Sequence, residues 1–369
     1  MLQIKKIEIM GMLKYRNCLS ALSLLISIQL YAAAFEDSKQ IKYAYQIDKT
    51  ASVELNNQYG EIEVNAWEKD SILVIATIKV STDNLAQANE LFELVEVNCR
   101  GNRTNVVVNS EWTEVSNVWK RGAMDLKKRY GSEKNLVINY KVYMPVTCRL
   151  AIKNRFGDVF LPNYLGSLRV EIAHGDLRAR NIKDARRIDV KYGKILIKDL
   201  DQGLIYLSYG DLIVDNAQKV SLESKSSNIE FFKVKELNIE SRNDDIRSDE
   251  VYQIRGNLTY SQLRIKKLDY IADLNTSYGD VNIKQIYSKF YSIRLNGNNT
   301  DIDLEFTHLA PFQFSIETSG NKSIDFMKEA TIVNETKDGN VTYIEGYVKD
   351  KEASPLVNIV SKNGYISFY

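Results

Sequence analysis

Three charged residues that share one position of a repeating pattern are the first candidates for chemistry. Glu230, Arg247 and Arg264 follow one another at steps of 17 residues, so stacked repeats would make them vertical neighbours on one exposed face. A carboxylate beside two guanidinium groups could bind an acidic sugar, and polysaccharide lyases and hydrolases are also built on parallel β-helices. An ordinary solvated sheet face gives the same row of residues, and we favour that interpretation.

A second candidate is a loop-like segment, residues 112–131, that combines aromatic and basic side chains. Trp112 and Trp119 could contact a glycan or a partner surface from this loop, together with the neighbouring lysines and arginines. The alternative, which we favour, is that the two tryptophans pack an N-terminal module against the first repeat.

The cysteines and histidines do not form a recognisable catalytic or metal-binding motif. Cys18 lies in the N-terminal apolar segment, and Cys99 and Cys148 could form a disulfide or be two buried thiols; the sequence leaves both open. His174 and His308 lie far apart, and His174 falls in a column of aromatic residues, where ring stacking is expected. The sequence therefore predicts no catalytic residues, no metal site and no cofactor.

An internal repeat defines the elements that must position these residues. A glycine, or the residue that replaces it, recurs at steps of 17 or 18 residues, at positions 157, 175, 193, 210, 227, 244, 261 and 279. Apolar residues recur two and four positions after it and five before it, with a period of two in each flank, as in strands with one buried face. The inward-facing positions have odd offsets before the glycine and even offsets after it, so the chain must turn at the glycine to keep both sets inside. Glycine tolerates the positive φ of such a corner.

Each repeat, called a rung below, is predicted to consist of strand, corner, strand and corner. A unit of 17–18 residues cannot bury its own core, so like units must stack. We expect an all-β fold, a parallel and right-handed β-solenoid over residues 146–305, with the aromatic residues before the glycines stacked from rung to rung. An antiparallel meander also fits the parity, but it does not explain why acidic and non-acidic residues alternate directly after the glycines.

The flanking regions are expected to cap the solenoid. Residues 35–145 are predicted to form a β-rich module with a helix near 84–96, capped by Asp83, and they contain one isolated copy of the repeat around Gly60. Residues 306–369 are predicted to form irregular rungs and a C-terminal cap, in which the repeat spacing returns around Gly364.

Residues 1–34 are predicted to be a signal peptide. A basic stretch precedes an apolar run of about 12 residues, too short for a membrane-spanning helix of roughly 20, and three alanines follow. The balance of 49 basic and 48 acidic residues argues against nucleic acid as a partner. We therefore expect an exported protein, in the periplasm, at the outer surface or secreted, with no membrane span after signal removal.

Several of these motifs resemble one known family. The copy of the repeat at residues 57–62, the segment Tyr140 to Pro145 and the serial Tyr-Gly-Asp units are similar to the DUF4097 family, adhesin-type proteins common in Bacteroidetes envelopes. The resemblance covers residues 41–369 and implies a non-enzymatic envelope protein that presents a long β face to a glycan or a surface protein. Two other classes stay open: a polysaccharide lyase or hydrolase, and a structural protein that polymerises end to end.

Overall fold

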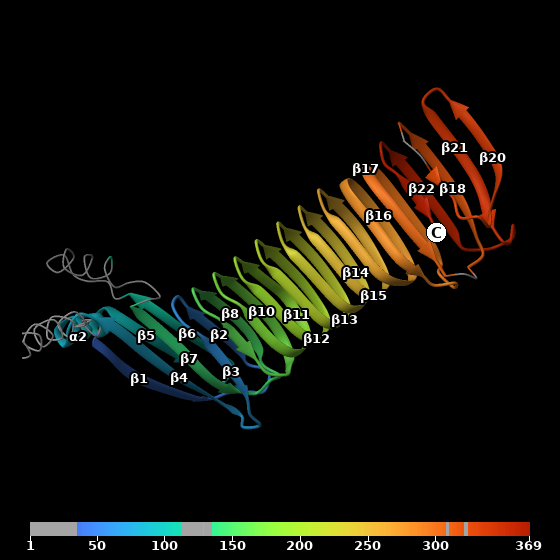
Figure 1. The fold of residues 1–369 in the computed structure, drawn as a ribbon. Helices are drawn as coiled ribbons and strands as arrows, with labels where there is room; N and C mark the ends of the chain where they lie inside the picture. Colours follow the sequence, from blue (N-terminus) through green and yellow to red (C-terminus); the bar gives the residue numbers. More distant parts are fainter. Residues whose placement is uncertain (1–34, 113–127, 129–134, 308–309, 321–323) are drawn as a thin grey trace, which may run out of the picture.

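The computed structural model describes residues 35–112, 128, 135–307, 310–320 and 324–369. The predicted signal peptide lies outside the described residues. The chain forms an elongated rod of stacked parallel coils with a β-rich module at its N-terminal end, which confirms the predicted all-β solenoid (Figure 1). The right-handed coiling stays a prediction. No helix among the described residues has the length and apolarity needed to cross a membrane.

The regular part of the rod consists of long strands that pair with their neighbours in parallel. They are β10 (Tyr164–Ala173), β11 (Leu177–Lys191), β12 (Lys194–Ser208), β13 (Asp211–Lys225), β14 (Asn228–Arg242), β15 (Asp245–Thr259), β16 (Gln262–Ile286) and β17 (Ser292–Phe306). Ile195, Leu212 and Ile229 are direct partners and are all buried, so the predicted inward column is confirmed. The parallel pairing of β12 with β13 excludes the antiparallel meander.

The N-terminal module continues the same sheet. Its elements are β1 (Phe35–Gln46), β2 (Ser52–Asn57), β3 (Ile62–Ala66), β4 (Ser71–Thr82), α2 (Leu85–Leu94), β5 (Val95–Gly101), β6 (Asn105–Trp112), β7 (Leu136–Met144), β8 (Arg149–Arg155) and β9 (Val159–Leu161). β2 and β3 pair in parallel with β8 and β9, and the Gly60 N–H donates to the Phe156 carbonyl at 3.0 Å. The isolated copy of the repeat is therefore a rung in register with the others.

The short helix α2 lies at the edge of this module and buries Ala88 and Leu91. Its N-cap is Asn84, not Asp83 as the sequence predicted. Asn84 is extended, with φ −161°, and its side chain accepts a hydrogen bond from the Gln87 N–H at 3.1 Å. The cap lies one residue later because the residue directly before the first helical turn reaches the free N–H groups best.

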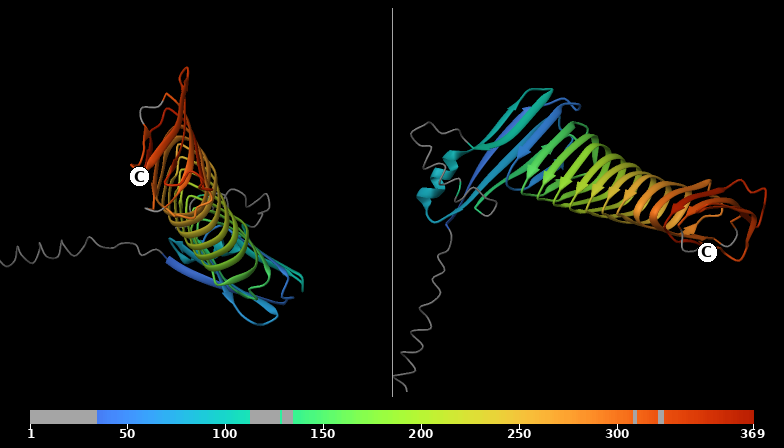
Figure 2. Two further views of the ribbon diagram at one scale, coloured as in Figure 1. Left: turned by 90° about the vertical axis from the view of Figure 1, so that its right-hand side faces the viewer. Right: turned by 90° about the horizontal axis from the view of Figure 1, so that it is seen from above.

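The C-terminal region closes the rod with two stacked pairs of parallel strands and an antiparallel extension. Its strands are β18 (Phe312–Ser319), β19 (Ile324–Asp325), β20 (Ala330–Asp338), β21 (Val341–Val348), β22 (Leu356–Lys362) and β23 (Ile366–Phe368). Leu295 pairs with Ile359 and Leu304 with Phe368, so the repeat spacing predicted around Gly364 is confirmed. β18 pairs with β22, and β21 and β20 extend the sheet beyond it, at the end of the rod opposite the N-terminal module (Figure 2).

The corners show why glycine recurs, and the reason differs from the expected one. The residue before the glycine has the left-handed backbone, with φ 58° at Tyr192 and 59° at Tyr209, whereas Gly193 and Gly210 do not. A Cβ added at Gly193 would lie 1.9 Å from the carbonyl oxygen of Gly175 on the preceding rung. At Gly193, glycine is therefore required for the close approach of two backbones, not for a positive φ.

The aromatic residues before the glycines stack as predicted. Ring centroids in the series Tyr59, Phe156, His174, Tyr192 and Tyr209 lie 5.6, 5.1, 4.9 and 5.2 Å apart, with neighbouring ring planes within 18° of each other. We call this corner column the aromatic ladder. Each stacked pair stabilises the fold by about 0.5–1.5 kcal/mol beyond the contribution of ring burial, so the ladder stabilises the register of consecutive rungs.

In the column directly after the glycines, acidic and non-acidic residues alternate from Asp176 to Asp280, as predicted. Two acids, Asp158 and Asp176, are neighbours at the first rung, where the sequence already showed a break. Asp211 lies between Lys194 and Asn228, and its carboxylate contacts the Lys194 ammonium at 2.9 Å and the Asn228 amide at 3.0 Å. The alternation ends where Asp280 pairs with Asp301. Burial raises the pKa of Asp280; Arg264 opposes this shift, and three nearby aspartates, including Asp301, add to it.

Replacing Asp280 with asparagine is expected to stabilise the protein at neutral pH. The folded state binds the Asp280 proton more tightly than the unfolded chain, whose aspartate pKa is about 3.9, so stability is lost as the pH rises through the raised pKa. Asp280→Asn should raise the free energy of unfolding at pH 7 by less than about 1 kcal/mol, and the gain should vanish near pH 3. Asp211→Asn is the control with the opposite sign, because its amide and lysine partners lower the pKa of Asp211. Urea unfolding at both pH values measures the difference, and equal effects of the two substitutions would contradict it.

Candidate functional site

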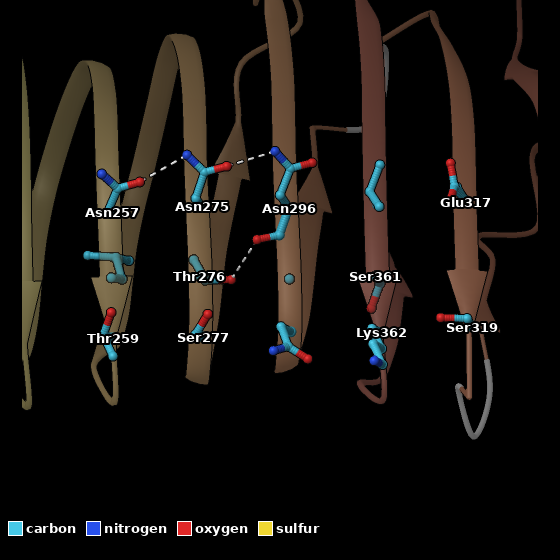
Figure 3. A pocket seen from close by; sticks show the side chains of 14 residues that line it. Asn257, Thr259, Asn275, Thr276, Ser277, Asn296, Glu317, Ser319, Ser361 and Lys362 are labelled. Carbon is cyan, nitrogen blue, oxygen red and sulfur yellow. Dashed lines mark hydrogen bonds between the residues drawn. The ribbon is translucent and has the colours of Figure 1, made fainter.

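A shallow groove of about 530 Å³ lies on the outer face of the C-terminal rungs. It runs across β15, β16, β17, β22 and β18, which lie side by side in this order (Figure 3). Each of these strands is paired on both sides, so its backbone N–H and C=O groups are engaged in the sheet. The groove therefore presents side chains rather than free backbone.

Strand alternation places two outward columns in the groove. Leu258 points inward and is buried, which turns its neighbours on both sides outward. The first column contains Asn257, Asn275, Asn296, Val360 and Glu317, and the second contains Thr259, Ser277, Asn298, Lys362 and Ser319. Amide and hydroxyl groups thus recur at the strand spacing of about 4.8 Å across the face.

The three asparagines of the first column form a hydrogen-bonded amide ladder. The Asn296 Nδ2 donates to the Asn275 Oδ1 at 2.7 Å, and the Asn275 Nδ2 donates to the Asn257 Oδ1 at 2.9 Å (Figure 3). The Asn257 Nδ2 donates in turn to both carboxylate oxygens of Glu240, at 2.8 and 3.0 Å. Because an ionised carboxylate only accepts hydrogen bonds, Glu240 determines the orientation of every amide after it.

The amide ladder ends at Asn296 because the next rung has Val360 at this position. All the amides donate towards Glu240, so the Asn296 Oδ1 lies at the end of a polarised chain, beside an apolar neighbour. Glu317 follows Val360 in the same column, and Lys362 lies in the adjacent one. Of the residues that line the groove these two are the charged ones, so the groove favours hydrogen bonding to a polar ligand.

The predicted face of Glu230, Arg247 and Arg264 lies on another side of the rod. The three residues are vertical neighbours, as expected. Asp245, which the sequence reasoning did not include, holds both guanidinium groups, with contacts of 2.6 Å to Arg247 and 2.8 Å to Arg264. Their charge is thus partly compensated within the protein, and a ligand at this face stays a prediction.

The other sequence candidates divide between described and undescribed residues. Trp112 is the last residue of β6, and Trp119 lies outside the described residues, so the loop contact stays a prediction. His174 stacks between Phe156 and Tyr192, which confirms its expected place in the aromatic column.

Of the two alternatives that the sequence left open for Cys99 and Cys148, the structure shows free thiols, Cys99 partly buried and Cys148 buried. Cys99 lies on β5, and Cys148 precedes β8. The strands follow in the order β5, β6, β2, β8, so three spacings, about 14 Å, separate the two strands. A disulfide needs Cα atoms within about 7 Å. Burial raises the pKa of each thiol to about 11, which keeps it protonated at neutral pH.

The sequence reasoning did not find the amide ladder. Asn257 and Asn275 are separated by 18 residues, one rung, but Asn296 follows 21 residues later because β16 and β17 are joined by a longer connection. Aligning the outward positions as well as the apolar ones would have found the first pair. The third member depends on a register that only the structure shows.

Comparisons with known proteins give distant structural likenesses. No protein-family model matches the chain, and no curated protein matches it. A putative cell adhesion protein from Clostridium sporogenes is similar at 12% identity, over 90% of this chain and 99% of its own, with a TM-score of 0.18. A putative adhesin from Bacteroides fragilis is similar at 12% identity, over 90% of this chain and 97% of its own, with a TM-score of 0.28. A putative adhesin from Parabacteroides distasonis is similar at 11% identity, over 73% and 94%, with a TM-score of 0.30. Such likenesses do not identify a ligand or an activity, and membership of the DUF4097 family stays a prediction.

Proposed function

We propose that this protein is a non-enzymatic, exported binding scaffold of the adhesin type that holds a glycan in the groove of the C-terminal rungs. The observation that carries the proposal is the oriented amide ladder from Asn257 to Asn296. Its side chains are held in place by one another and by a rigid sheet, so little side-chain entropy is lost when a ligand binds.

The chemistry of the groove favours a saccharide over a peptide. A peptide that binds a sheet usually adds a strand at an exposed edge, and the strands of the groove have no free edge. The hydroxyl groups of a sugar both donate and accept hydrogen bonds, which matches the amide and hydroxyl side chains of the two columns. The signal-peptide pattern supports an envelope or secreted location, where such ligands occur.

Replacing Asn275 with leucine is expected to weaken glycan binding by about tenfold, because the central amide of the ladder is lost and its two neighbours are no longer held in position. A glycan and surface-protein array identifies the ligand, and titration calorimetry then compares wild type with Asn275→Leu. Asn216→Leu is the matched control, since Asn216 makes one amide hydrogen bond to Asp199, at 2.9 Å, outside the groove. The control should bind as wild type does.

Three results would count against the proposal. Equal affinities of the Asn275 and Asn216 variants would show that the groove does not bind the glycan. Capture of surface proteins but of no glycans would show that the ligand is a protein. Turnover of an acidic polysaccharide that disappears in Arg247→Ala would favour the lyase or hydrolase class instead.

A further inference from the structure

The aromatic ladder is interrupted at two rungs in the middle of the solenoid. Tyr209 ends one stack and Tyr260 begins the next, while Ser226 and Asn243 hold the same corner position between them. All four residues share the left-handed backbone, with φ of 59°, 54°, 52° and 60° in the order named. Their side chains therefore leave the corner in the same direction, and two rings are missing from a row that is otherwise continuous here. We call this interruption the ladder gap.

The ladder gap has room for ring-shaped groups. Tyr209 and Tyr260 are three rungs apart, about 14 Å at the strand spacing. Rings on consecutive rungs lie 5.2 Å apart before the gap and 4.9 Å apart after it, so two rings fit between these tyrosines. A separate hollow of about 500 Å³ lies on the other side of Tyr209 and Ser226, over Lys194 and Asp211. The floor of the ladder gap is polar, because the Asn243 Nδ2 donates to the Ser226 Oγ at 3.2 Å.

Two cations lie next to the ladder gap, because Lys225 directly precedes Ser226 and Arg242 directly precedes Asn243 in the chain. Lys225 and Arg242 are exposed and are direct partners in the parallel register, so like charges are stacked at the strand spacing, which is unfavourable. The Lys225 Nζ lies 5.6 Å from the centre of the Tyr209 ring. The carboxylates two residues away, Glu223 and Glu240, form no ion pair with them in the described part of the chain. An anion between the two cations would relieve their repulsion.

The carboxylates on the opposite flank already have cationic partners. Asp211 forms an ion pair with Lys194 at 2.9 Å. Asp245 contacts Arg247 and Arg264 at 2.6 and 2.8 Å. These acids therefore repel an incoming anion less than free carboxylates would.

We propose that the ladder gap is a binding site for an acidic saccharide. A pyranose ring of the ligand occupies the place of a missing aromatic ring, and its hydroxyl groups hydrogen-bond to the polar floor. The carboxylate or sulfate group lies between Lys225 and Arg242. An apolar aromatic ligand would cover the floor without satisfying its hydrogen bonds, and a neutral sugar would leave the two cations uncompensated. The site adjoins the groove of the C-terminal rungs and does not depend on a ligand there.

Filling the ladder gap tests the proposal and removes one exposed hydrogen bond, between Asn243 and Ser226. In the double variant Ser226→Tyr with Asn243→Tyr the aromatic ladder is complete, and tyrosine already adopts this backbone on neighbouring rungs. The variant is therefore expected to melt at the wild-type temperature or above. Calorimetric titration with a short oligogalacturonate should give binding to wild type and none to the filled variant. The methyl-esterified oligomer, the same chain without its charge, should bind wild type about tenfold more weakly.

A second pair of variants separates charge from shape and from the groove. Lys225→Gln with Arg242→Gln should weaken binding by about tenfold and flatten its dependence on salt. Asn216→Leu, which lies outside both the groove and the ladder gap, should bind oligogalacturonate as wild type does. The filled variant leaves every groove residue unchanged, so failure of the groove proposal leaves this one standing. Binding retained by the filled variant overturns the proposal, as do equal affinities for the acid and its ester, or no binding of wild type to either oligogalacturonate or a sulfated disaccharide.

Discussion

Replacing Gly193 with valine is expected to destabilise the solenoid by about 3 kcal/mol or more, which exceeds the roughly 1 kcal/mol of an ordinary glycine propensity change. A Cβ at this position would meet the Gly175 carbonyl oxygen at 1.9 Å and its carbon at 2.8 Å. Both are backbone atoms of a paired rung and cannot move away singly. The rung must shift, which weakens the parallel ladder between β11 and β12 on both sides of the corner.

Two further variants make the Gly193 result specific. Lys198→Val introduces the same side chain at an exposed position of β12, the strand that follows Gly193, and should stay within about 0.5 kcal/mol of wild type. Gly193→Ser should lie between the two, because later rungs carry serine at this corner position, as at Ser227 and Ser261. Chemical unfolding followed by circular dichroism gives all three values. Equal stability of Gly193→Val and Lys198→Val would show that the corners are loose loops.

Replacing Asp244 with alanine is expected to destabilise the protein by about 3–5 kcal/mol, because several hydrogen-bond donors at a buried corner lose their acceptor. Asp244 is 4% exposed, and its carboxylate accepts hydrogen bonds from the hydroxyl groups of Ser224 and Ser241 at 2.7 and 2.6 Å. It also accepts from the backbone N–H groups of Ser227 and Arg242, at 2.8 and 3.1 Å. Alanine would leave all four donors without this acceptor, and unsatisfied buried donors cost about 1–3 kcal/mol each.

A thermodynamic cycle isolates the Asp244 network. In a background where Ser224 and Ser241 are both alanine, the hydroxyl donors are absent, so the further change Asp244→Ala should cost clearly less than in wild type. Unfolding free energies of the four proteins give the coupling. Identical costs of Asp244→Ala in the two backgrounds would mean that the serines do not contribute, and a loss below about 1 kcal/mol in wild type would refute the network.

Gly193 and Asp244 hold the same corner position on different rungs. The sequence predicted the corner but not the contacts that these residues make there. The recurrence at 17 or 18 residues identified the corner and the glycines. It did not show that Tyr192 takes the positive φ while Gly193 makes the close contact, since both explanations give the same pattern of residues. In the sequence Asp244 looked like a degenerate copy of the glycine, because two of its donors, Ser224 and Ser227, lie on the preceding rung, 20 and 17 residues away.

For the candidate sites too, the repeat predicted some features and only the tertiary structure decided the others. The column of Glu230, Arg247 and Arg264 followed from the period alone, but its compensation by Asp245 depends on side-chain geometry. The disulfide alternative for Cys99 and Cys148 could not be decided from spacing, because the order of strands within the N-terminal module is not periodic.

The sequence by itself determined the architecture of this protein: a rung that cannot bury its own core must stack in register, and period-two strands assign the inward face. Only the tertiary structure decided what the outward face presents. The amide ladder follows the parallel register across a longer connection between β16 and β17, and the ladder gap places Lys225 against Arg242 on successive rungs. A repeat can specify which side chains are buried, because the same apolar positions recur in every rung. Contacts between exposed polar groups instead depend on the register and on the side-chain orientation at each rung.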